Sequence, residues 1–162
     1  VETEAVSRGV GRPTQFWRLT SHGHAQFPDT HAEITVSLLR NIRELLGNDT
    51  LEQLIAARED EMRRIYRAEI GKAKSLEERL AALAALRTRE GYMAEYCKAD
   101  DGDGWLLVEN HCPICAAATA CQGFCRSELA IFREMLGPTC DIERTEHIIQ
   151  GARRCAYLIR PV

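Results

Sequence analysis

The segment from Cys112 to Cys155 reads CPICAAATACQGFCRSELAIFREMLGPTCDIERTEHIIQGARRC, and the pattern of its cysteines dominates the sequence. Four of them, Cys112, Cys125, Cys140 and Cys155, are separated by twelve, fourteen and fourteen residues. Packing alone does not require such a spacing. Thiolates prefer soft metal ions, and four of them complete either a tetrahedral zinc site or an iron–sulfur cluster. The sequence therefore indicates a metal centre held by these four residues.

The stretch from Cys112 to Cys125 contains no charged side chain, although 28% of the whole chain is charged. A poorly solvated environment around sulfur ligands limits the access of water and tunes the properties of a bound metal centre. The same composition also suits a buried helix. This stretch is thus compatible with a metal centre without proving one.

Three further cysteines, Cys97, Cys115 and Cys121, leave alternatives open. Cys97 lies in a predicted strand, and we expect it to be a small buried residue. Cys112-x-x-Cys115 with Cys121-x-x-x-Cys125 resembles a compact zinc pattern, although its five-residue middle gap is short for a zinc ribbon. Cys112-Pro-Ile-Cys115 is also typical of a thiol-redox motif, in which a following helix lowers the pKa of the first thiol.

Length and composition limit the class of protein. The chain has 162 residues, 45% of them hydrophobic, which is enough for the core of one ordinary domain. Its formal net charge of −3 gives no general attraction to nucleic acid, so DNA binding needs a local basic surface. Without a long apolar run or an apolar leader segment, we expect a soluble cytoplasmic protein with no membrane partner. Seven cysteines in a reducing compartment should be thiols or metal ligands.

Three helices are predicted between residues 29 and 90. The first ends at Gly47 and carries a continuous apolar stripe, which packs either on the chain's own core or on a second copy, so that a homodimer is expected. The second covers about residues 50–70, and its charges of both signs indicate a solvated face. The third begins at a capping box formed by Ser75 and Glu78.

Strands and two shorter helices are predicted after residue 90. The strands cover 92–98, 105–110, 139–149 and 155–159, and the helices lie within 114–122 and 127–136. Residues 99–104 form an acidic turn between two strands and lack the later glutamate of a calcium loop. In the last hairpin, alternation predicts that Cys140 and Cys155 face the same side, so that both thiols point at one pocket.

The residues near the N-terminus, 11–28, read GRPTQFWRLTSHGHAQFP and predict a basic turn followed by a short strand. With the preceding residues they form a hairpin arm that carries Arg8, Arg12 and Arg18. This stretch resembles the wing of a winged helix-turn-helix transcription factor, with a Gly-Arg-Pro tip and an aromatic return strand. The resemblance implies that Arg12 and Arg18 contact DNA, and that the recognition helix lies outside this chain.

Four motifs surround the widely spaced cysteines: Glu109-Asn-His-Cys-Pro, Cys125-Arg-Ser-Glu-Leu, Cys140-Asp-Ile-Glu-Arg-Thr-Glu-His and Gly151-Ala-Arg-Arg-Cys-Ala-Tyr-Leu-Ile. They resemble the C-terminal half of SufR-type iron–sulfur transcriptional regulators, which are often labelled DeoR-like or ArsR-like. The resemblance implies a non-enzymatic regulator that controls iron–sulfur assembly genes. It also implies that a 4Fe-4S or 2Fe-2S cluster is held by Cys112, Cys125, Cys140 and Cys155.

The chain departs from that family in two respects. It has fourteen residues in the middle gap where the family has thirteen, and Cys115 and Cys121 are additional. Cys115, Cys121 or His111 are therefore alternative ligands, and zinc is an alternative metal. Because a thiolate-bound cluster is anionic, we expect nearby cations to offset its charge. The candidates are Arg126, Arg144, Arg153 and Arg154.

Taken together, these observations predict an α+β protein in three parts. Residues 1–28 form the remnant of a winged-helix wing, residues 29–90 form long dimerisation-type helices, and residues 91–162 form a small α/β sensor domain with antiparallel strands. The leading hypothesis is a regulator whose DNA binding responds to an iron–sulfur cluster. The alternatives are a zinc-stabilised ligand-sensing or dimerisation domain, and a thiol-redox protein that uses Cys112 and Cys115.

Overall fold

The computed structural model of the chain describes residues 1–6, 13–20, 30–100 and 102–162. The chain divides into two compact units, Val1–His31 and Ala32–Val162. The first unit contains an antiparallel hairpin of β1 (Glu2–Val6) and β2 (Thr14–Arg18). The hairpin agrees with the predicted arm. Arg8 and Arg12, however, lie outside the described residues, so the wing remains a prediction.

The helices are α2 (His31–Leu46), α3 (Asn48–Ile70), α4 (Leu76–Arg89), α5 (Cys115–Ala120) and α6 (Gly123–Leu136). Their boundaries follow local chemistry. Gly47 adopts a φ of 87° between α2 and α3, and Gly137 adopts a φ of 91° after α6, a region of backbone conformation that favours glycine. The predicted capping box of Ser75 and Glu78 is present at the start of α4.

A four-stranded antiparallel sheet has the order β3-β4-β6-β5. Its strands are β3 (Ala94–Lys98), β4 (Trp105–Glu109), β5 (Cys140–Glu146) and β6 (Cys155–Pro161). The first long strand of the last hairpin is shorter than predicted, because its pairing is irregular between Arg144 and Glu146 and a 3-10 turn, η1 (Ile148–Gln150), follows. The antiparallel α/β architecture itself agrees with the prediction.

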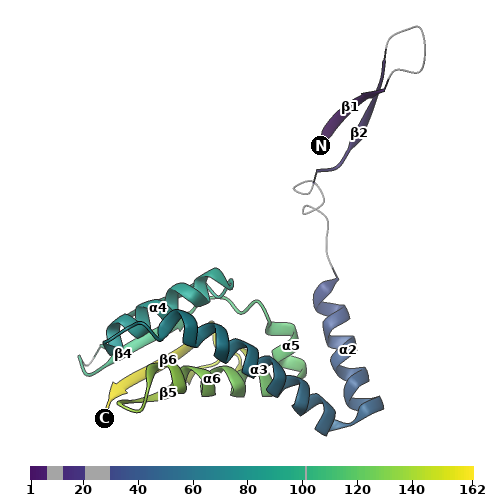
Figure 1. The fold of residues 1–162 in the computed structure, drawn as a ribbon. Coiled ribbons are helices and arrows are strands. Elements are labelled where there is room, and N and C mark those ends of the chain that lie inside the picture. The colour runs from purple at the N-terminus through teal and green to yellow at the C-terminus, as the bar shows by residue number, and fades with distance from the viewer. Residues whose placement is uncertain (7–12, 21–29, 101) are drawn as a thin grey trace. The chain divides into compact units, whose positions relative to one another are not determined.

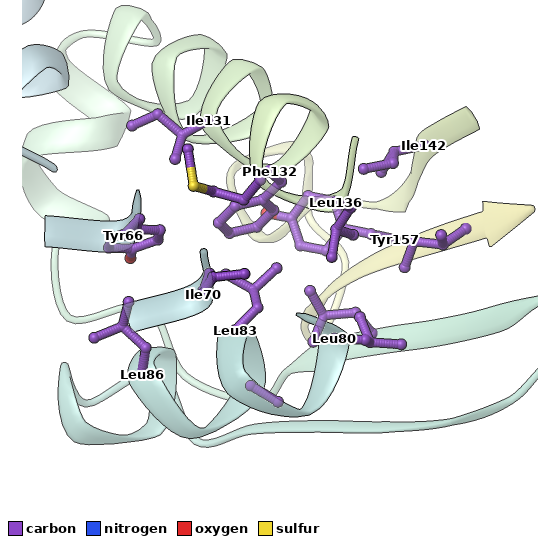
Figure 2. Close-up of a cluster of buried hydrophobic side chains, with 14 of the residues drawn as sticks. Tyr66, Ile70, Leu80, Leu83, Leu86, Ile131, Phe132, Leu136, Ile142 and Tyr157 are labelled. Carbon is purple, nitrogen blue, oxygen red and sulfur yellow. The ribbon is translucent and has the colours of Figure 1, made fainter. Parts of the chain in front are cut away.

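Helices cover one face of this sheet (Figure 1). Helix α4 lies against β3, α6 lies against β5, and α3 packs on both helices. Alternate strand residues point into the space between the layers, where Ile142 and Tyr157 meet Phe132 and Leu83 (Figure 2). All four of these side chains are buried. Removal of this apolar surface from water is the main term that stabilises the second unit.

Helix α2 has no buried residue, in contrast to α3. Only one side of its apolar stripe is used within the chain, because Leu39 and Ile42 pack against a small cluster of Leu51, Ile55 and Cys121. The other side is exposed at Ile34, Leu38, Leu45 and Leu46. Among the helices of the described residues, none combines the length and apolar character needed to cross a membrane.

Candidate functional site

Four thiols from the sensor half of the chain lie near one another, and we call them the thiol site: Cys112, Cys115, Cys125 and Cys155. Cys112 follows β4, and Cys115 begins α5. Cys125 lies in the first turn of α6, and Cys155 begins β6 opposite Glu109 of β4. Because β4 and β6 are paired at this point, the loop after β4 returns to the start of β6. The sheet therefore positions the ends of the segment that carries the four thiols.

The pKa values of these thiols show that they share an environment. Burial raises the pKa of Cys112 to about 12, and the charges of Cys115 and Cys155 act in the same direction. Burial also raises the pKa of Cys125 to about 11, again with contributions from Cys155 and Cys115. Each of Cys112 and Cys125 thus feels the charge of both Cys115 and Cys155, so the thiol site is one electrostatic unit.

Backbone amides supply a counteracting influence at two of these sulfurs. The N–H of Ile114 donates to Cys112, and the N–H of Ile148 donates to Cys155; both hydrogen bonds favour the thiolate. Burial nevertheless dominates, and the pKa of Cys155 is also raised. Without a cation, Cys112, Cys125 and Cys155 are therefore thiols at neutral pH.

Cys140, the remaining predicted ligand, lies elsewhere. It faces the same side of the sheet as Cys155, as predicted, because Ile142 pairs with Ile159 on the buried face. The register of the hairpin nevertheless separates the two residues, since Cys140 pairs with Pro161 at the other end of β6. Six residues of strand correspond to roughly 20 Å. The structure brings Cys112, Cys125 and Cys155 together and leaves Cys140 out.

The surroundings of Cys140 agree with that separation. Its thiol lies 3.6 Å from the carbonyl oxygen of Gly137. Burial raises its pKa, followed by the charge of Asp141, while Arg79 acts in the opposite direction. The pKa of Cys140 is thus set by burial, Asp141 and Arg79, and not by a cysteine of the thiol site.

Cys121, His111 and Cys97 have surroundings of other kinds. Cys121 is buried in the small cluster beneath α2 with Leu51 and Ile55. His111 is exposed. Cys97 lies in β3, where a strand was predicted, but it is exposed rather than buried, because β3 is an edge strand and Cys97 lies on the side away from the helices. Its expected burial is therefore wrong.

Arg144 is the cation beside the thiol site. Its Nη2 donates to the carbonyl oxygen of Cys125 at 2.7 Å, and its guanidinium lies 5.2 Å from the ring centre of Tyr157. Its Nε is buried and finds no hydrogen-bond partner among the described residues. Burial acts to lower the pKa of Arg144, but Tyr157, Cys125 and Cys155 raise it overall.

His147 carries a second buried nitrogen without a partner in the described chain, Nε2. Burial lowers the pKa of His147, and the charge of Arg144 lowers it further. The residue directly precedes Ile148, whose amide faces Cys155. Buried polar atoms without partners are uncommon in folded proteins, and these two lie at one edge of the thiol site.

The other three arginines expected near the ligands have different partners. Arg126 pairs with Glu52, and Arg154 pairs with Glu146. Arg153 reaches the side-chain oxygen of Asn110 at 3.4 Å. Arg144 is therefore the one of the four predicted cations that the structure places beside Cys125 and Cys155.

A buried charged cluster, here called the Arg87 network, adjoins the thiol site. Arg87 is completely buried and bonds the carboxylates of Glu109 and Glu128. The hydroxyl of Tyr92 donates to Glu128 at 2.6 Å, and the ring of Tyr92 lies 3.3 Å from the Arg87 guanidinium carbon. Tyr66 also contacts this guanidinium at 3.2 Å. Each charge in the network therefore has a polar partner.

The network and the thiol site influence each other. The charge of Glu128 raises the pKa of Cys112 and Cys125, after burial as the main cause. Glu109 lies beside Cys155 across the strand pair, and burial raises its pKa despite the opposing effect of Arg87. Two buried carboxylates on a single guanidinium thus leave excess negative charge close to the four sulfurs, which favours a cation there.

The sequence analysis did not predict the Arg87 network, although the sequence contains a pattern that indicates it. Leu80, Leu83 and Arg87 follow an i, i+3, i+7 pattern, so the arginine occupies a position of the apolar stripe of α4. Glu128 lies three residues after Cys125 and hence on the same face of α6. A charged residue on an apolar stripe indicates a buried ion pair, but the pattern does not identify its partners.

The geometry of the sulfurs is not that of a formed metal site. Within residues 1–6, 13–20, 30–100 and 102–162, no group of three or more His, Cys, Asp or Glu side chains has a metal-holding arrangement. The raised pKa of Cys112 is also the opposite of what the thiol-redox hypothesis requires, because a reactive cysteine needs a lowered pKa.

Comparisons with known proteins do not define a family for this chain. No protein-family model matches it, and no curated protein matches it. Among solved structures it is similar to the phenol-responsive sensory domain of the transcription activator PoxR, with a TM-score of 0.44 and 15% sequence identity. That similarity covers 81% of this chain and 74% of the other. At this identity and score, the function of that domain does not transfer to this chain.

Proposed function

We propose that residues 91–162 bind a thiolate-ligated metal centre, and that the chain is the sensory part of a transcription regulator. The single observation that carries the proposal is the convergence of Cys112, Cys115, Cys125 and Cys155 from separate elements into one electrostatic unit. The proposed ligand set keeps three of the residues expected from the sequence. It replaces Cys140 by Cys115.

The residues around the sulfurs fit an anionic thiolate centre. The buried Nε of Arg144 and Nε2 of His147 lack partners among the described residues, and a charged group at the sulfurs would give them one. A bound cation would supply the positive charge that keeps the four sulfurs deprotonated in a poorly solvated site. The side chains would have to draw together on binding, which makes metal uptake part of the folding energy of this region.

An iron–sulfur cluster is the first candidate for this centre, because four thiolates from an uncharged segment suit it and because the sequence motifs resemble SufR-type regulators. Zinc is the second candidate, and one observation favours it. Two residues separate Cys112 from Cys115 in a tight turn, in which the N–H of Cys115 donates to the carbonyl oxygen of Cys112. Such a pair is common in structural zinc sites.

Reconstitution under anaerobic conditions separates the two metals. The protein is treated with ferrous iron and sulfide, and in parallel with zinc; iron, sulfide and zinc are then quantified and the iron product is examined by absorbance and Mössbauer spectroscopy. Stoichiometric iron with sulfide supports the cluster, and stoichiometric zinc alone supports the zinc centre. Uptake of neither would defeat the proposal.

Single cysteine variants test the ligand set. Serine in place of Cys112, Cys115, Cys125 or Cys155 is expected to abolish or strongly weaken uptake, whereas Cys140→Ser retains it. Circular dichroism of each metal-free variant checks that the loss reflects a missing ligand rather than a failure to fold. Loss of uptake in Cys140→Ser, with retention in Cys115→Ser, would instead support the ligand set expected from the sequence.

The proposed link from the metal centre to DNA passes through the hairpin of β1 and β2. Arg18 is exposed there and bonds Glu2 at 2.7 Å, so its charge is accessible but already paired. We expect this chain to bind operator DNA weakly, because a wing without a recognition helix supplies mainly backbone contacts. Tight sequence-specific binding by residues 1–162, measured by fluorescence anisotropy, would show that the wing hypothesis is wrong.

Self-association through α2 is part of the same proposal. Ile34, Leu38 and Leu45 lie within one stripe of this helix and are 53%, 56% and 80% exposed. A second copy of the stripe would remove this apolar surface from water. Sedimentation equilibrium of Leu38→Glu is expected to give monomers where the unaltered chain gives dimers. A monomeric unaltered chain would contradict this part of the proposal.

A further inference from the structure

A small cavity lies beside the thiol site and is not used by the proposed metal centre. Its volume is about 230 Å³, and it is lined by α3, by the end of α4 and by the loop that joins Cys112 to Cys115. The lining residues are Arg58, Met62, Glu90, Tyr92, Pro113 and Ile114. Ligand pockets usually start near 300 Å³, so this cavity suits a fragment-sized molecule.

The walls of the cavity are mainly apolar. Met62 and Tyr92 are almost completely buried, and Pro113 and Ile114 supply further apolar lining. The loop is held in place, because the N–H of His111 donates to the carbonyl oxygen of Tyr92 at 3.1 Å. A flat apolar body therefore has a preformed surface on which to pack.

Arg58 is the cation of the cavity, and it differs from Arg63 and Arg67 of the same helix. Arg63 and Arg67 both bond Glu134. Among the described residues Arg58 forms no ion pair, and its Nη1 is buried without a hydrogen-bond partner. Its guanidinium is held over the ring of Phe124, 5.6 Å from the ring centre. Since that buried nitrogen does not face the open cavity, a ligand's acceptor would meet the remaining, accessible part of the Arg58 guanidinium.

Glu90 is the opposing charge at the cavity, but it already has partners. It accepts a hydrogen bond from Tyr66 at 2.6 Å and another from Arg87 at 3.3 Å. The carboxylate of Glu90 thus already accepts two hydrogen bonds, one of them from a cation, whereas the positive charge of Arg58 has no ion pair among the described residues. The unpaired charge at the cavity is therefore the cation of Arg58, which favours an anionic group beside it.

We propose that this cavity binds a small organic acid, with the carboxylate on Arg58 and a flat apolar body against Met62, Tyr92 and Ile114. The inference goes beyond the proposed metal centre and does not require it. The two sites nevertheless share the loop from Cys112 to Cys115, and the amide of Ile114 donates to the sulfur of Cys112. A molecule that packs on Ile114 is therefore in a position to alter the surroundings of a sulfur ligand.

Benzoate is a suitable probe, titrated into the ¹⁵N-labelled chain at pH 7 and followed by NMR. We expect saturable shifts that include the amides of Tyr92 and Ile114, in metal-free and metal-loaded protein alike. Arg58→Gln should weaken binding at least ~10-fold, since it removes a charge-assisted hydrogen bond. Arg58→Lys keeps the charge and should weaken binding less. The matched control is Arg64→Gln, which alters an exposed arginine of the same helix and should leave binding unchanged.

Two related probes test the chemistry of the ligand. Acetate carries the charge without the ring, and benzyl alcohol carries the ring without the charge; both should bind more weakly than benzoate. The proposal is overturned if benzoate gives no saturable shifts, if Arg58→Gln binds it as well as the unaltered chain does, or if either related probe binds equally well. Because metal-free protein is included, failure here is distinguishable from failure of metal uptake.

Discussion

The Arg87 network and the thiol site are adjacent, but they differ in how their buried polar atoms are partnered. In the network, two buried carboxylates bond a buried guanidinium, and the hydroxyl of Tyr92 donates to one of the carboxylates. In the thiol site, burial keeps the sulfurs protonated, and Arg144 and His147 each retain a buried nitrogen without a partner in the described residues. In the first arrangement every charge has an opposite charge beside it; even Nη2 of Arg87, which makes no hydrogen bond among the described residues, lies 3.2 Å from the carboxylate of Glu128. In the second, the two unpartnered nitrogens have no carboxylate within ion-pair distance among the described residues, which is the difference between a structural cluster and a site that could accept an anionic group.

Arg87→Met should produce the largest loss of stability, because it leaves Glu109 and Glu128 buried without their cation. Breaking a buried ion pair from one side costs about 3–5 kcal/mol of the free energy of unfolding. Urea denaturation followed by circular dichroism measures the effect. Arg89→Met is the matched control, since Arg89 forms an exposed pair with Glu69 and should cost less than about 1 kcal/mol. Equal losses in the two variants would show that the network is not structural.

Alkaline pH should separate the metal-free thiol site from the network. The folded pKa of Cys112 is about 12 and that of Cys125 about 11, both above the ordinary thiol value. A raised pKa stabilises the fold below the unfolded pKa, and this stability is lost as the pH rises toward the folded value. At about pH 10 the loss is on the order of 2 kcal/mol per thiol.

The measurement is a series of urea denaturation curves between about pH 7 and pH 10. A metal-loaded protein should lack this decline, because its sulfurs are already deprotonated. Cys112→Ser should also reduce the decline in metal-free protein, whereas Cys97→Ser should not, because Cys97 is exposed. A decline of equal size in Cys112→Ser would mean that other groups are responsible.

Arg144 offers a sharper test of the unused bonding capacity. Arg144→Gln should weaken retention of the bound metal about tenfold, since it removes a charge beside Cys125 and Cys155. Arg144→Lys should restore part of that retention. The readout is the rate of metal loss to a chelator, together with the absorbance spectrum of the loaded protein. Arg126→Gln is the control, because Arg126 pairs with Glu52 instead. Unchanged retention in Arg144→Gln would remove this residue from the site.

The smallest effect is expected at Glu134, where two arginines of α3 meet α6. Burial acts to raise the pKa of Glu134, but Arg63 and Arg67 lower it overall. A lowered pKa contributes stability above the unfolded pKa, and this contribution is lost as the pH falls. Glu134→Gln should therefore cost less than about 1 kcal/mol at pH 7 and nothing near pH 3. Urea denaturation at both pH values measures it, with exposed Glu143→Gln as the control.

Local patterns in the sequence predict most of the helices and strands, and also the facing of the last hairpin. The capping box at Ser75, the glycine after α2 and the alternation of Ile142 with its neighbours all act within a few residues. The site depends on longer-range facts. The side of the sheet that Cys140 faces does not determine its distance from Cys155. That distance depends on the register of β5 against β6, which pairs Cys140 with Pro161 at the far end of β6.

The proposed exchange of Cys140 for Cys115 has the same origin. Spacing along the chain favours Cys140, whereas it offers Cys115 only as an alternative ligand and as part of a zinc or thiol-redox pattern with Cys112. Its position became clear once the pairing of Glu109 with Cys155 brought the ends of the segment together. The unpartnered nitrogens of Arg144 and His147 also could not be predicted, since they depend on packing from three elements.

The position of β6 in the sheet has a consequence for how the molecule is made. This strand comes later in the chain than β3, β4 and β5, yet it lies between β4 and β5. Until β6 is synthesised, β4 and β5 have no strand between them to pair with, and Cys155, the first residue of β6, is not yet part of the chain. Cys112, Cys115 and Cys125 are therefore synthesised before Cys155, so the convergence of the four thiols requires a late, non-local folding step.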